Sequence, residues 1–310
     1  MKVGIIDLGT NTFNLIIAEI DEKGGYTHLY KSKVGVKLGE GSFSKNYITE
    51  AAMQRAFVAL EAQINAIKNH YCDRILCFAT SAIRNASNGA DFVEKVKAKF
   101  GMTIYVIDGN REAELIYNGV RLSGALSEDN ALIMDIGGGS TEFIIASQGE
   151  IHHASSFEIG VTRLRERFSP SDPLSEKDIA EMEGLLDGML GEVYRQAKEK
   201  NVGYLVGCSG SFDTLSNLLA YRLDRFEEMV GASTVDFEIE PFKQLLSDLI
   251  KSERSEREAM EGMAALRINI IAISALMTRL VMDRTGIDRV TLSKFSLKEG
   301  VLFDVLKGKL

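Results

Sequence analysis

The sequence is poor in the residue types that build disulfide frameworks and soft-metal sites. Its 310 residues include only three cysteines, Cys72, Cys77 and Cys208, and four histidines. The cysteines are odd in number and lack metal-ligand spacing, which argues against a disulfide scaffold and favours reduced thiols in a cytoplasm. The histidines form no ligand pattern either. We therefore expect neither a disulfide-stabilised fold nor a metal centre built from cysteine and histidine.

Long apolar runs and an excess of positive charge are also missing. No apolar run reaches the roughly 18 residues that a membrane span requires, and the N-terminus starts directly on a predicted strand without a signal peptide. The formal net charge of −8 argues against a basic face for nucleic acid or an acidic membrane. A cytoplasmic enzyme or binding protein is expected, with no nucleic-acid and no membrane partner. A polyanionic substrate would need metal ions, backbone N–H groups and a few placed arginines.

What the sequence does contain is a glycine-rich segment between two apolar runs. Residues 135–142 read Asp-Ile-Gly-Gly-Gly-Ser-Thr-Glu. This pattern predicts two strands joined by a tight loop, because glycine tolerates positive φ and lets a ligand approach the backbone. A strand-end carboxylate, neighbouring N–H groups and a following hydroxyl pair are the parts of a site that holds phosphate through a metal ion. Taken alone, the segment also fits an ordinary glycine-rich hairpin with solvated carboxylates.

The N-terminal region repeats this segment in register. Residues 7–18 align without a gap with residues 135–146, at a constant offset of 128 residues. Aspartate, glycine, a hydroxyl residue, two isoleucines and alanine recur. The period is too long for a solenoid and indicates a duplicated domain, and the chain is long enough for two domains that each bury a core. We therefore expect two phosphate-gripping hairpins that face each other across a cleft.

Two further segments place small residues where a strand passes into a helix. Residues 79–86 follow a short buried strand, and Arg84 there could reach a phosphate with two hydrogen bonds. Helix capping explains the hydroxyls of this segment equally well. Residues 207–211 open a helix in the same way and are a third candidate anion site. No Ser-His-Asp order accompanies Ser209, so a catalytic nucleophile is not expected there.

Helix signals bear on four other segments. The segment after Asp108 starts a helix with acids in its first turn, which the helix macrodipole favours, so Glu112 and Glu114 need no further role on spacing alone. Thr49 is a plausible N-cap for an amphipathic helix over residues 49–69. Residues 263–284 predict an apolar helix with a buried stripe from Met263 to Leu280. Gly160, followed by Arg163 and Arg165, is a further candidate anion contact.

Together these segments resemble the exopolyphosphatase and guanosine pentaphosphate phosphohydrolase (Ppx/GppA) family, in its short form without a C-terminal helical extension. The resemblance covers nearly the whole chain. Its most specific stretches are residues 79–84, 112–117, 135–142 and 160–164. It implies a duplicated ribonuclease-H-like α/β fold of the actin, sugar kinase and Hsp70 superfamily, with two domains around a central cleft. The expected domains are residues 1–124 with 293–310, and residues 125–292.

The resemblance also implies an activity, namely metal-dependent hydrolysis of the terminal phosphate of inorganic polyphosphate, guanosine pentaphosphate or both. Asp7 and Asp135 would hold Mg²⁺ or Mn²⁺, with Glu142 as a second metal or water contact and a third catalytic-site residue. By resemblance, Glu112 is the general base, and Arg84 would stabilise the transferring phosphoryl group. The expected phosphate-binding residues are Gly9, Thr10, Asn11, Thr12, Gly137, Gly138, Gly139, Ser140, Thr141, Ser209, Gly210 and Ser211.

Four positions depart from the family pattern and bear on substrate choice. Arg111 stands where many members have a second glutamate, Asn269 and Ser274 replace an aspartate and a glycine, and Lys298 replaces an arginine. Two other functions stay open. One is an ATP-dependent small-molecule kinase of the same superfamily, and the other is a non-catalytic alarmone-binding regulator of the stringent response. Assembly as a homodimer also stays open.

Overall fold

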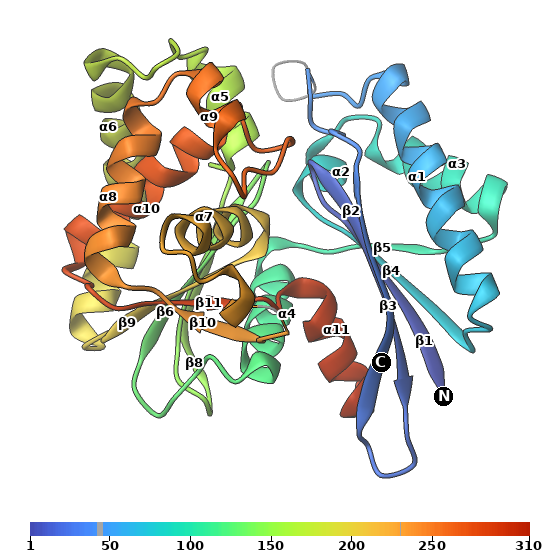
Figure 1. Cartoon of the computed structure of the whole chain (residues 1–310). Coiled ribbons are helices and arrows are strands. Elements are labelled where there is room, and N and C mark those ends of the chain that lie inside the picture. Colours follow the sequence, from blue (N-terminus) through green and yellow to red (C-terminus); the bar gives the residue numbers. More distant parts are fainter. Residues whose placement is uncertain (42–45, 230) are drawn as a thin grey trace. The chain divides into compact units, whose positions relative to one another are not determined.

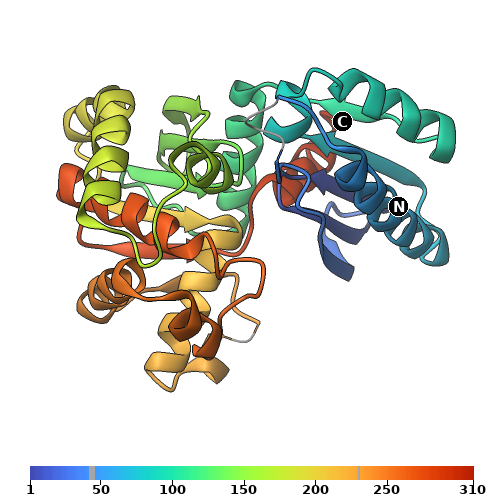
Figure 2. The ribbon, with the colours of Figure 1, turned by 90° about the horizontal axis from the view of Figure 1, so that it is seen from above.

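The computed structural model describes residues 1–41, 46–229 and 231–310. The chain divides into two compact units (Figure 1). Unit 1 is Met1–Gly119 together with Leu297–Leu310, and unit 2 is Val120–Ser296. Both termini belong to unit 1 (Figure 2), where Arg74 Nη1 donates to the Leu310 carbonyl at 3.1 Å. Within the described ranges, no helix is long and apolar enough to cross a membrane.

Unit 1 is built on a mixed five-stranded sheet. Its strands are β1 (Lys2–Leu8), β2 (Thr12–Ile20), β3 (Tyr26–Gly35), β4 (Arg74–Ala79) and β5 (Ile104–Val106). They lie in the order β3-β2-β1-β4-β5. The first three form an antiparallel meander, whereas β4 runs parallel to both β1 and β5. Asp7 therefore lies near the end of a strand that has a neighbour on each side.

Helices cover both faces of this sheet. The helices of unit 1 are α1 (Glu50–Asn69), α2 (Ser81–Asn85), α3 (Gly89–Phe100) and α11 (Leu297–Leu306), and α4 (Gly109–Ser123) begins in unit 1 and ends in unit 2. Figure 1 shows α1 and α3 on one face and α11 on the other. The predicted N-cap of α1 is confirmed, since Thr49 Oγ1 accepts the Ala52 N–H at 3.2 Å. The predicted apolar stripe of α1, from Ala52 to Ile67, is buried as well.

Unit 2 repeats the same strand order. Its strands are β6 (Ala131–Ile136), β7 (Thr141–Ala146), β8 (Ile151–Phe157), β9 (Tyr204–Cys208), β10 (Thr234–Asp236) and β11 (Val290–Ser293). The sheet order is β8-β7-β6-β9-β11-β10. Again three antiparallel strands are followed by two parallel ones, and the short antiparallel β10 is added at the edge. The predicted duplicated ribonuclease-H-like α/β fold is confirmed.

The helices of unit 2 include one that the sequence misplaced. They are α5 (Val161–Phe168), α6 (Glu176–Glu199), α7 (Ser209–Arg222), the 3₁₀ helix η1 (Phe226–Met229), α8 (Ile239–Lys251), α9 (Arg254–Ala259) and α10 (Ile271–Thr285). The helix predicted from Met263 begins only at Ile271, so its first part was wrong. Arg257 Nε donates a hydrogen bond to the Ile268 carbonyl at 2.7 Å, and Gly262 has a φ of +88°. The chain before Ile271 therefore forms turns instead of a helix.

Candidate functional site

The two predicted hairpins share one turn geometry. Gly9 N–H donates to the Thr12 carbonyl at 3.1 Å, and Gly137 N–H donates to the Ser140 carbonyl at 3.1 Å. A Cβ at Gly9 would lie 3.0 Å from the Thr12 oxygen, and one at Gly137 would lie 2.8 Å from the Ser140 oxygen. A side chain would therefore clash at Gly137 and would fit at Gly9 only after a small shift of the turn. The 128-residue repeat extends to individual hydrogen bonds.

In the second hairpin, the start of α5 binds the carbonyl groups of the loop. Val161 N–H donates to the Gly137 oxygen at 3.0 Å, and Gly160 N–H donates to the Gly139 oxygen at 3.2 Å. The Gly138 oxygen accepts from two further N–H groups at the start of α5. By contrast, the N–H groups of Gly138 and Gly139 have no acceptor among the described residues. A loop whose carbonyls are bound and whose N–H groups are not is suited to an anion.

In the first hairpin, a different segment binds the carbonyl groups of the loop. Val36 and Lys37 both donate their N–H groups to the Asn11 carbonyl at 2.9 Å, and Gly39 N–H donates to the Thr10 carbonyl at 3.1 Å. These donors come from the chain just after β3, which is the counterpart of β8 in unit 2. Each loop is thus held from behind by the segment that follows its third strand.

The strand-end aspartates are held differently in the two units. Asp7 lies opposite Asn14 in the ladder, and Asn14 Nδ2 donates to Asp7 Oδ2 at 2.9 Å. Asp135 is 5% exposed and lies opposite Glu142. Its Oδ2 accepts from Ser296 Oγ at 2.6 Å and from Cys208 Sγ at 3.5 Å. The carboxylate of Asp135 is therefore oriented by residues outside its own hairpin.

Glu142 completes a pair of buried carboxylates in unit 2. It is 1% exposed, and Ser156 Oγ donates to its Oε1 at 2.7 Å. Residues opposite each other in a ladder project from the same face of the sheet, so Asp135 and Glu142 are neighbours. Within the ranges that the structure describes, no group of three or more histidine, cysteine or acidic residues could hold a metal ion. Hard oxygen donors in this small number suit Mg²⁺, which one or two carboxylates hold together with water and substrate phosphate.

Unit 1 brings together the predicted base and the predicted arginine. Arg84 Nη1 donates to Glu112 Oε2 at 2.8 Å and to the Ile107 carbonyl at 3.0 Å. Glu112 is 6% exposed although it sits in the first turn of α4. Glu114, two residues later, has a side chain that is 43% exposed and pairs with Arg111. The helix-macrodipole explanation therefore suffices for Glu114 but not for Glu112, which is buried in an ion pair.

Two of the predicted phosphate-binding hydroxyls are buried and bond to main-chain carbonyl groups. Thr141 is fully buried, and its Oγ1 donates toward the Ile159 carbonyl at 3.4 Å. Ser211 is also fully buried, donates to the Ile136 carbonyl at 3.2 Å and accepts from Ser274 Oγ at 3.1 Å. Both hydroxyls thus stabilise the loops from inside.

The remaining predicted hydroxyls are buried without such contacts. Thr10, Thr12 and Ser140 are 5%, 7% and 3% exposed, and their hydroxyls make no hydrogen bond to a described residue. Ser209, at the start of α7 beside Gly210, has a left-handed backbone with a φ of +70°. Three of the four predicted hydroxyl residues in the two hairpins, Thr10, Thr12 and Ser140, can therefore still bind a ligand.

Arg267 belongs to the site region but has no motif that would reveal it. It is 6% exposed, and Nη1 donates to Ser211 Oγ at 3.4 Å. Burial lowers the pKa of Arg267, while the negative charges of Asp213 and Asp135 act against the shift. A buried guanidinium whose side chain makes one long hydrogen bond to the described residues is a candidate anion contact. The only sequence signal is an arginine before the apolar stripe of α10.

Three of the four family departures have a structural explanation. Arg111 bonds Glu114 Oε2 at 2.6 Å and the fully buried Asp304 at 2.5 Å, so it joins α4 to α11 within unit 1. Ser274 bonds Ser211, as described above. Lys298 pairs with the buried Glu299 at 3.1 Å. The structure shows no contact that explains Asn269.

Comparison with known proteins agrees with this geometry. The model of the Ppx/GppA phosphatase family matches residues 16–309. Exopolyphosphatase 1 of Mycobacterium tuberculosis is 26% identical over 310 residues, which cover 100% of this chain and 89% of that protein. The guanosine-5′-triphosphate,3′-diphosphate pyrophosphatase of Photobacterium profundum is 28% identical over 303 residues, which cover 97% of this chain and 58% of that protein.

Solved structures give the same result. The crystal structure of an exopolyphosphatase from Cytophaga hutchinsonii has a TM-score of 0.95 and 35% identity, and the match covers 99% of this chain and 98% of that one. A Ppx/GppA family member from Aquifex aeolicus has a TM-score of 0.82 and 25% identity, with 100% and 99% covered. The resemblance found in the sequence is confirmed.

Proposed function

The chain belongs to the Ppx/GppA phosphatase family, and we propose that it hydrolyses the terminal phosphoanhydride bond of inorganic polyphosphate, guanosine pentaphosphate or both. The observation that carries this proposal is the duplicated loop. Each copy has its carbonyl groups bound from behind, and in unit 2 the N–H groups of Gly138 and Gly139 have no acceptor among the described residues. Such loops suit a chain of negatively charged phosphates in a protein that carries a net charge of −8.

The proposal gives the loops the task of positioning. Phosphoryl transfer to water needs alignment and neutralisation of oxygen charge more than it needs a covalent catalyst. The N–H groups of Gly9–Thr12 and Gly137–Thr141 would bind phosphate oxygens, with Ser209 and Gly210 at the start of α7 as a further contact. Arg267 adds a buried positive charge in unit 2.

Glu112 is assigned the proton transfer. Water attacks the terminal phosphorus, the bond to the bridging oxygen breaks, and the Glu112 carboxylate accepts the proton of the water. Arg84 bonds this carboxylate at 2.8 Å and so restricts its position. We also assign Arg84 a contact with the transferring phosphoryl group, since a guanidinium has donors for more than one acceptor.

The residues of unit 2 fit a divalent cation. Asp135 and Glu142 are neighbouring buried carboxylates, and Asp7 is the matching strand-end carboxylate of unit 1. We assign these three residues to Mg²⁺ or Mn²⁺. When bound, the cation would neutralise phosphate oxygens. Full phosphate release after exhaustive chelation would contradict this assignment.

The test of the function is phosphate release from three substrates in parallel. Long-chain polyphosphate, tripolyphosphate and guanosine pentaphosphate are each incubated with the purified protein and Mg²⁺. We expect release from at least one of them. ATP-dependent phosphorylation of a small molecule would favour the kinase instead, and tight alarmone binding with no release would favour the regulator.

A further inference from the structure

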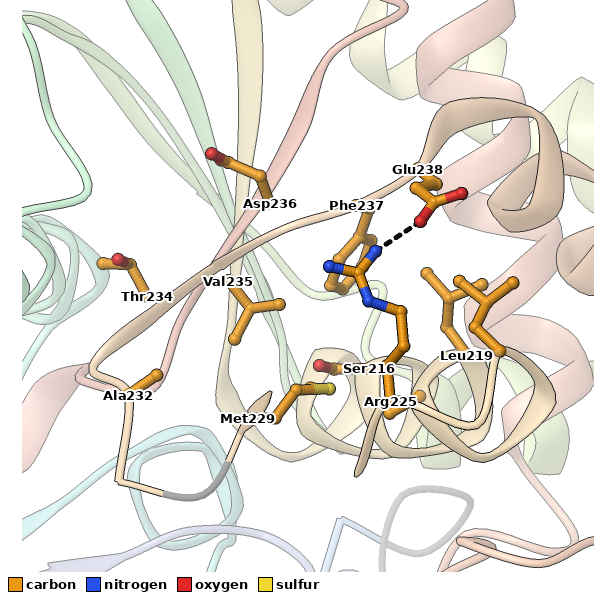
Figure 3. Close-up of a pocket in the computed structure, with 12 residues that line it drawn as sticks. Ser216, Leu219, Arg225, Met229, Ala232, Thr234, Val235, Asp236, Phe237 and Glu238 are labelled. Carbon is orange, nitrogen blue, oxygen red and sulfur yellow. Dashed lines mark hydrogen bonds and ion pairs between the residues drawn. The ribbon is translucent and has the colours of Figure 1, made fainter. Parts of the chain in front are cut away.

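A pocket in unit 2 lies apart from the loops described above. It has a volume of about 270 Å³ and is lined by the C-terminal half of α7, by Arg225 and Met229, and by Ala232 and residues 234–238 (Figure 3). Its volume is close to the lower end of the range for small-molecule sites, about 300 Å³. Its walls combine polar and apolar surface in about equal parts, and the apolar lining residues are Leu219, Ala220, Leu223, Met229, Ala232, Val235 and Phe237.

Ser216 places one polar group among these apolar residues. Its side chain lines the pocket, the residue is 1% exposed, and its hydroxyl has no hydrogen-bond partner among the described residues. A helical hydroxyl usually bonds the carbonyl four residues earlier, as Thr214 Oγ1 does with Gly210 at 2.9 Å. Leaving a buried hydroxyl unpaired costs about 1–3 kcal/mol. The unpaired hydroxyl therefore indicates a ligand that bonds it.

The strand β10 contributes main-chain groups to the same pocket. Phe237 N–H donates to the Val290 carbonyl, and Lys294 N–H donates to the Ser233 carbonyl, both at 2.9 Å. In an antiparallel pair alternate residues bond the partner strand, so Thr234 and Asp236 direct their N–H and C=O groups to the outer edge. Figure 3 shows the side chains of Thr234 and Asp236 turned away from those of Val235 and Phe237. Thr234 and Asp236 are among the lining residues, and the ladder leaves their main-chain groups without a strand partner among the described residues.

Two of the lining side chains, those of Arg225 and Glu238, form an ion pair. Arg225 Nη1 donates to Glu238 Oε1, and the two side chains are 48% and 51% exposed (Figure 3). An ion pair this exposed is worth about 0–1 kcal/mol and opens easily. Because the two charges cancel, the pocket does not select for an anion, unlike the phosphate loops. Glu238 can accept from sugar hydroxyls, which is how carboxylates bind ribose in dinucleotide sites.

We propose that this pocket binds the base of a nucleoside. A flat heteroaromatic ring with polar atoms at its edge suits walls that are partly apolar and partly polar. A ring nitrogen or carbonyl can bond Ser216, and a donor–acceptor edge can pair with the main chain of Thr234 or Asp236. The ribose hydroxyls would reach Glu238 and Arg225. Hydrolysis of inorganic polyphosphate needs no base site, so the inference goes beyond that part of the proposed function. For guanosine pentaphosphate it rests on the proposed function and adds a site for the base.

The direct test uses nucleosides without phosphate, so that the loops cannot contribute. Adenosine and guanosine are titrated into the full chain by calorimetry, and we expect at least one to bind saturably at one site. Ser216→Ala should weaken binding about 3- to 10-fold, the value of one neutral hydrogen bond. Ala220→Leu should weaken it more than about 10-fold, since the longer side chain fills the pocket. Thr214→Val is the matched control, because it removes a buried hydroxyl from the same helix outside the pocket.

Stability separates a ligand site from a structural serine. Ser216→Ala removes an unpaired hydroxyl, so the ligand-free variant should unfold at the wild-type temperature or above it, whereas Thr214→Val should unfold below it. If Ala220→Leu does not fold, Ala220→Met replaces it. Failure of both nucleosides to bind would overturn the proposal. Equal binding by every variant, or binding of indole in place of both nucleosides, would overturn it as well.

Two sources of the base can be distinguished by activity. If the pocket takes the base of a phosphorylated substrate, guanosine will compete with guanosine pentaphosphate and leave tripolyphosphate hydrolysis unchanged. If it takes a free nucleoside, guanosine or adenosine will change the hydrolysis of both. Either result supports the pocket. With tripolyphosphate, which has no base, phosphate release by Ser216→Ala and Ala220→Leu should equal that of the wild type, so failed nucleoside binding is distinguishable from failed hydrolysis.

Discussion

The two hairpins share their turn and differ in the residue that faces the aspartate. In unit 1 the ladder partner of Asp7 is Asn14, whose amide donates a hydrogen bond to the carboxylate. In unit 2 the partner of Asp135 is Glu142, which cannot donate when ionised. Ser296 and Cys208 supply the donors instead, and Ser296 comes from the segment that leads into α11. A duplicated backbone has thus acquired two different side-chain environments.

This difference assigns different tasks to the two units. Neighbouring buried carboxylates repel each other, so Asp135 and Glu142 favour a cation between them. In unit 1 an amide replaces one of these charges, and the buried acid, Glu112, is paired with Arg84 instead. We infer that unit 2 contributes most of the metal binding and unit 1 contributes the proton acceptor. Four experiments test this division, starting with the largest expected effect.

Glu112→Gln should reduce turnover by at least ~10² while substrate binding stays near normal, because the amide cannot accept the proton of the water. Steady-state phosphate release measures this effect. Glu114→Gln is the matched control on the same helix, and its exposed side chain predicts little change. Near-wild-type turnover of Glu112→Gln would remove Glu112 from the mechanism and leave unit 1 without a proton acceptor.

Gly160→Ala should distort the second hairpin alone. A Cβ at Gly160 would lie 2.4 Å from the backbone of Gly138 and Gly139, and we expect a loss of about 1–3 kcal/mol in the free energy of unfolding. Phosphate release should fall with it, because the loop shifts. Gly149→Ala serves as the control, since a Cβ there meets no atom within 4 Å. An unchanged stability of Gly160→Ala would contradict the close packing of α5 on this loop.

Ser296→Ala should weaken metal binding about 10-fold, the size of effect expected when a residue that orients a metal ligand is lost. Titration of Mn²⁺ by calorimetry measures this without substrate. Asn14→Ala, the corresponding change beside Asp7, should have a smaller effect. If Asn14→Ala weakens Mn²⁺ binding more than Ser296→Ala does, the metal-binding role belongs to unit 1 and the comparison is reversed.

The smallest effect concerns the thiols. Burial, with the nearby charge of Asp7, raises the pKa of Cys77, and burial, with the charge of Asp135, raises the pKa of Cys208. Both should stay protonated and unlabelled by iodoacetamide at neutral pH. Cys72 is only half-buried and should label slowly, faster as the pH rises toward its raised pKa. Mass spectrometry counts the labels, and rapid labelling of Cys208 would show that Asp135 is less buried than described.

Much of the fold could be predicted because it depends on local patterns. The helix α1 follows from a threonine N-cap and a regular apolar stripe, and both hairpins follow from apolar strands around glycine. The start of α10 could not be predicted in this way. There Arg257 binds the Ile268 carbonyl from a different helix, and this contact competes with the helical hydrogen bond.

The sequence by itself determined the repeat, its glycines and the identity of the acidic residues, because these depend on residue type and order. Only the tertiary structure distinguished Glu112, buried against Arg84, from Glu114 on the surface. It also revealed that Ser296 orients Asp135 from 161 residues away and that the Ser216 hydroxyl, in a pocket, has no hydrogen-bond partner among the described residues. Burial and hydrogen-bond partners depend on residues that are distant along the chain, and no local pattern contains them.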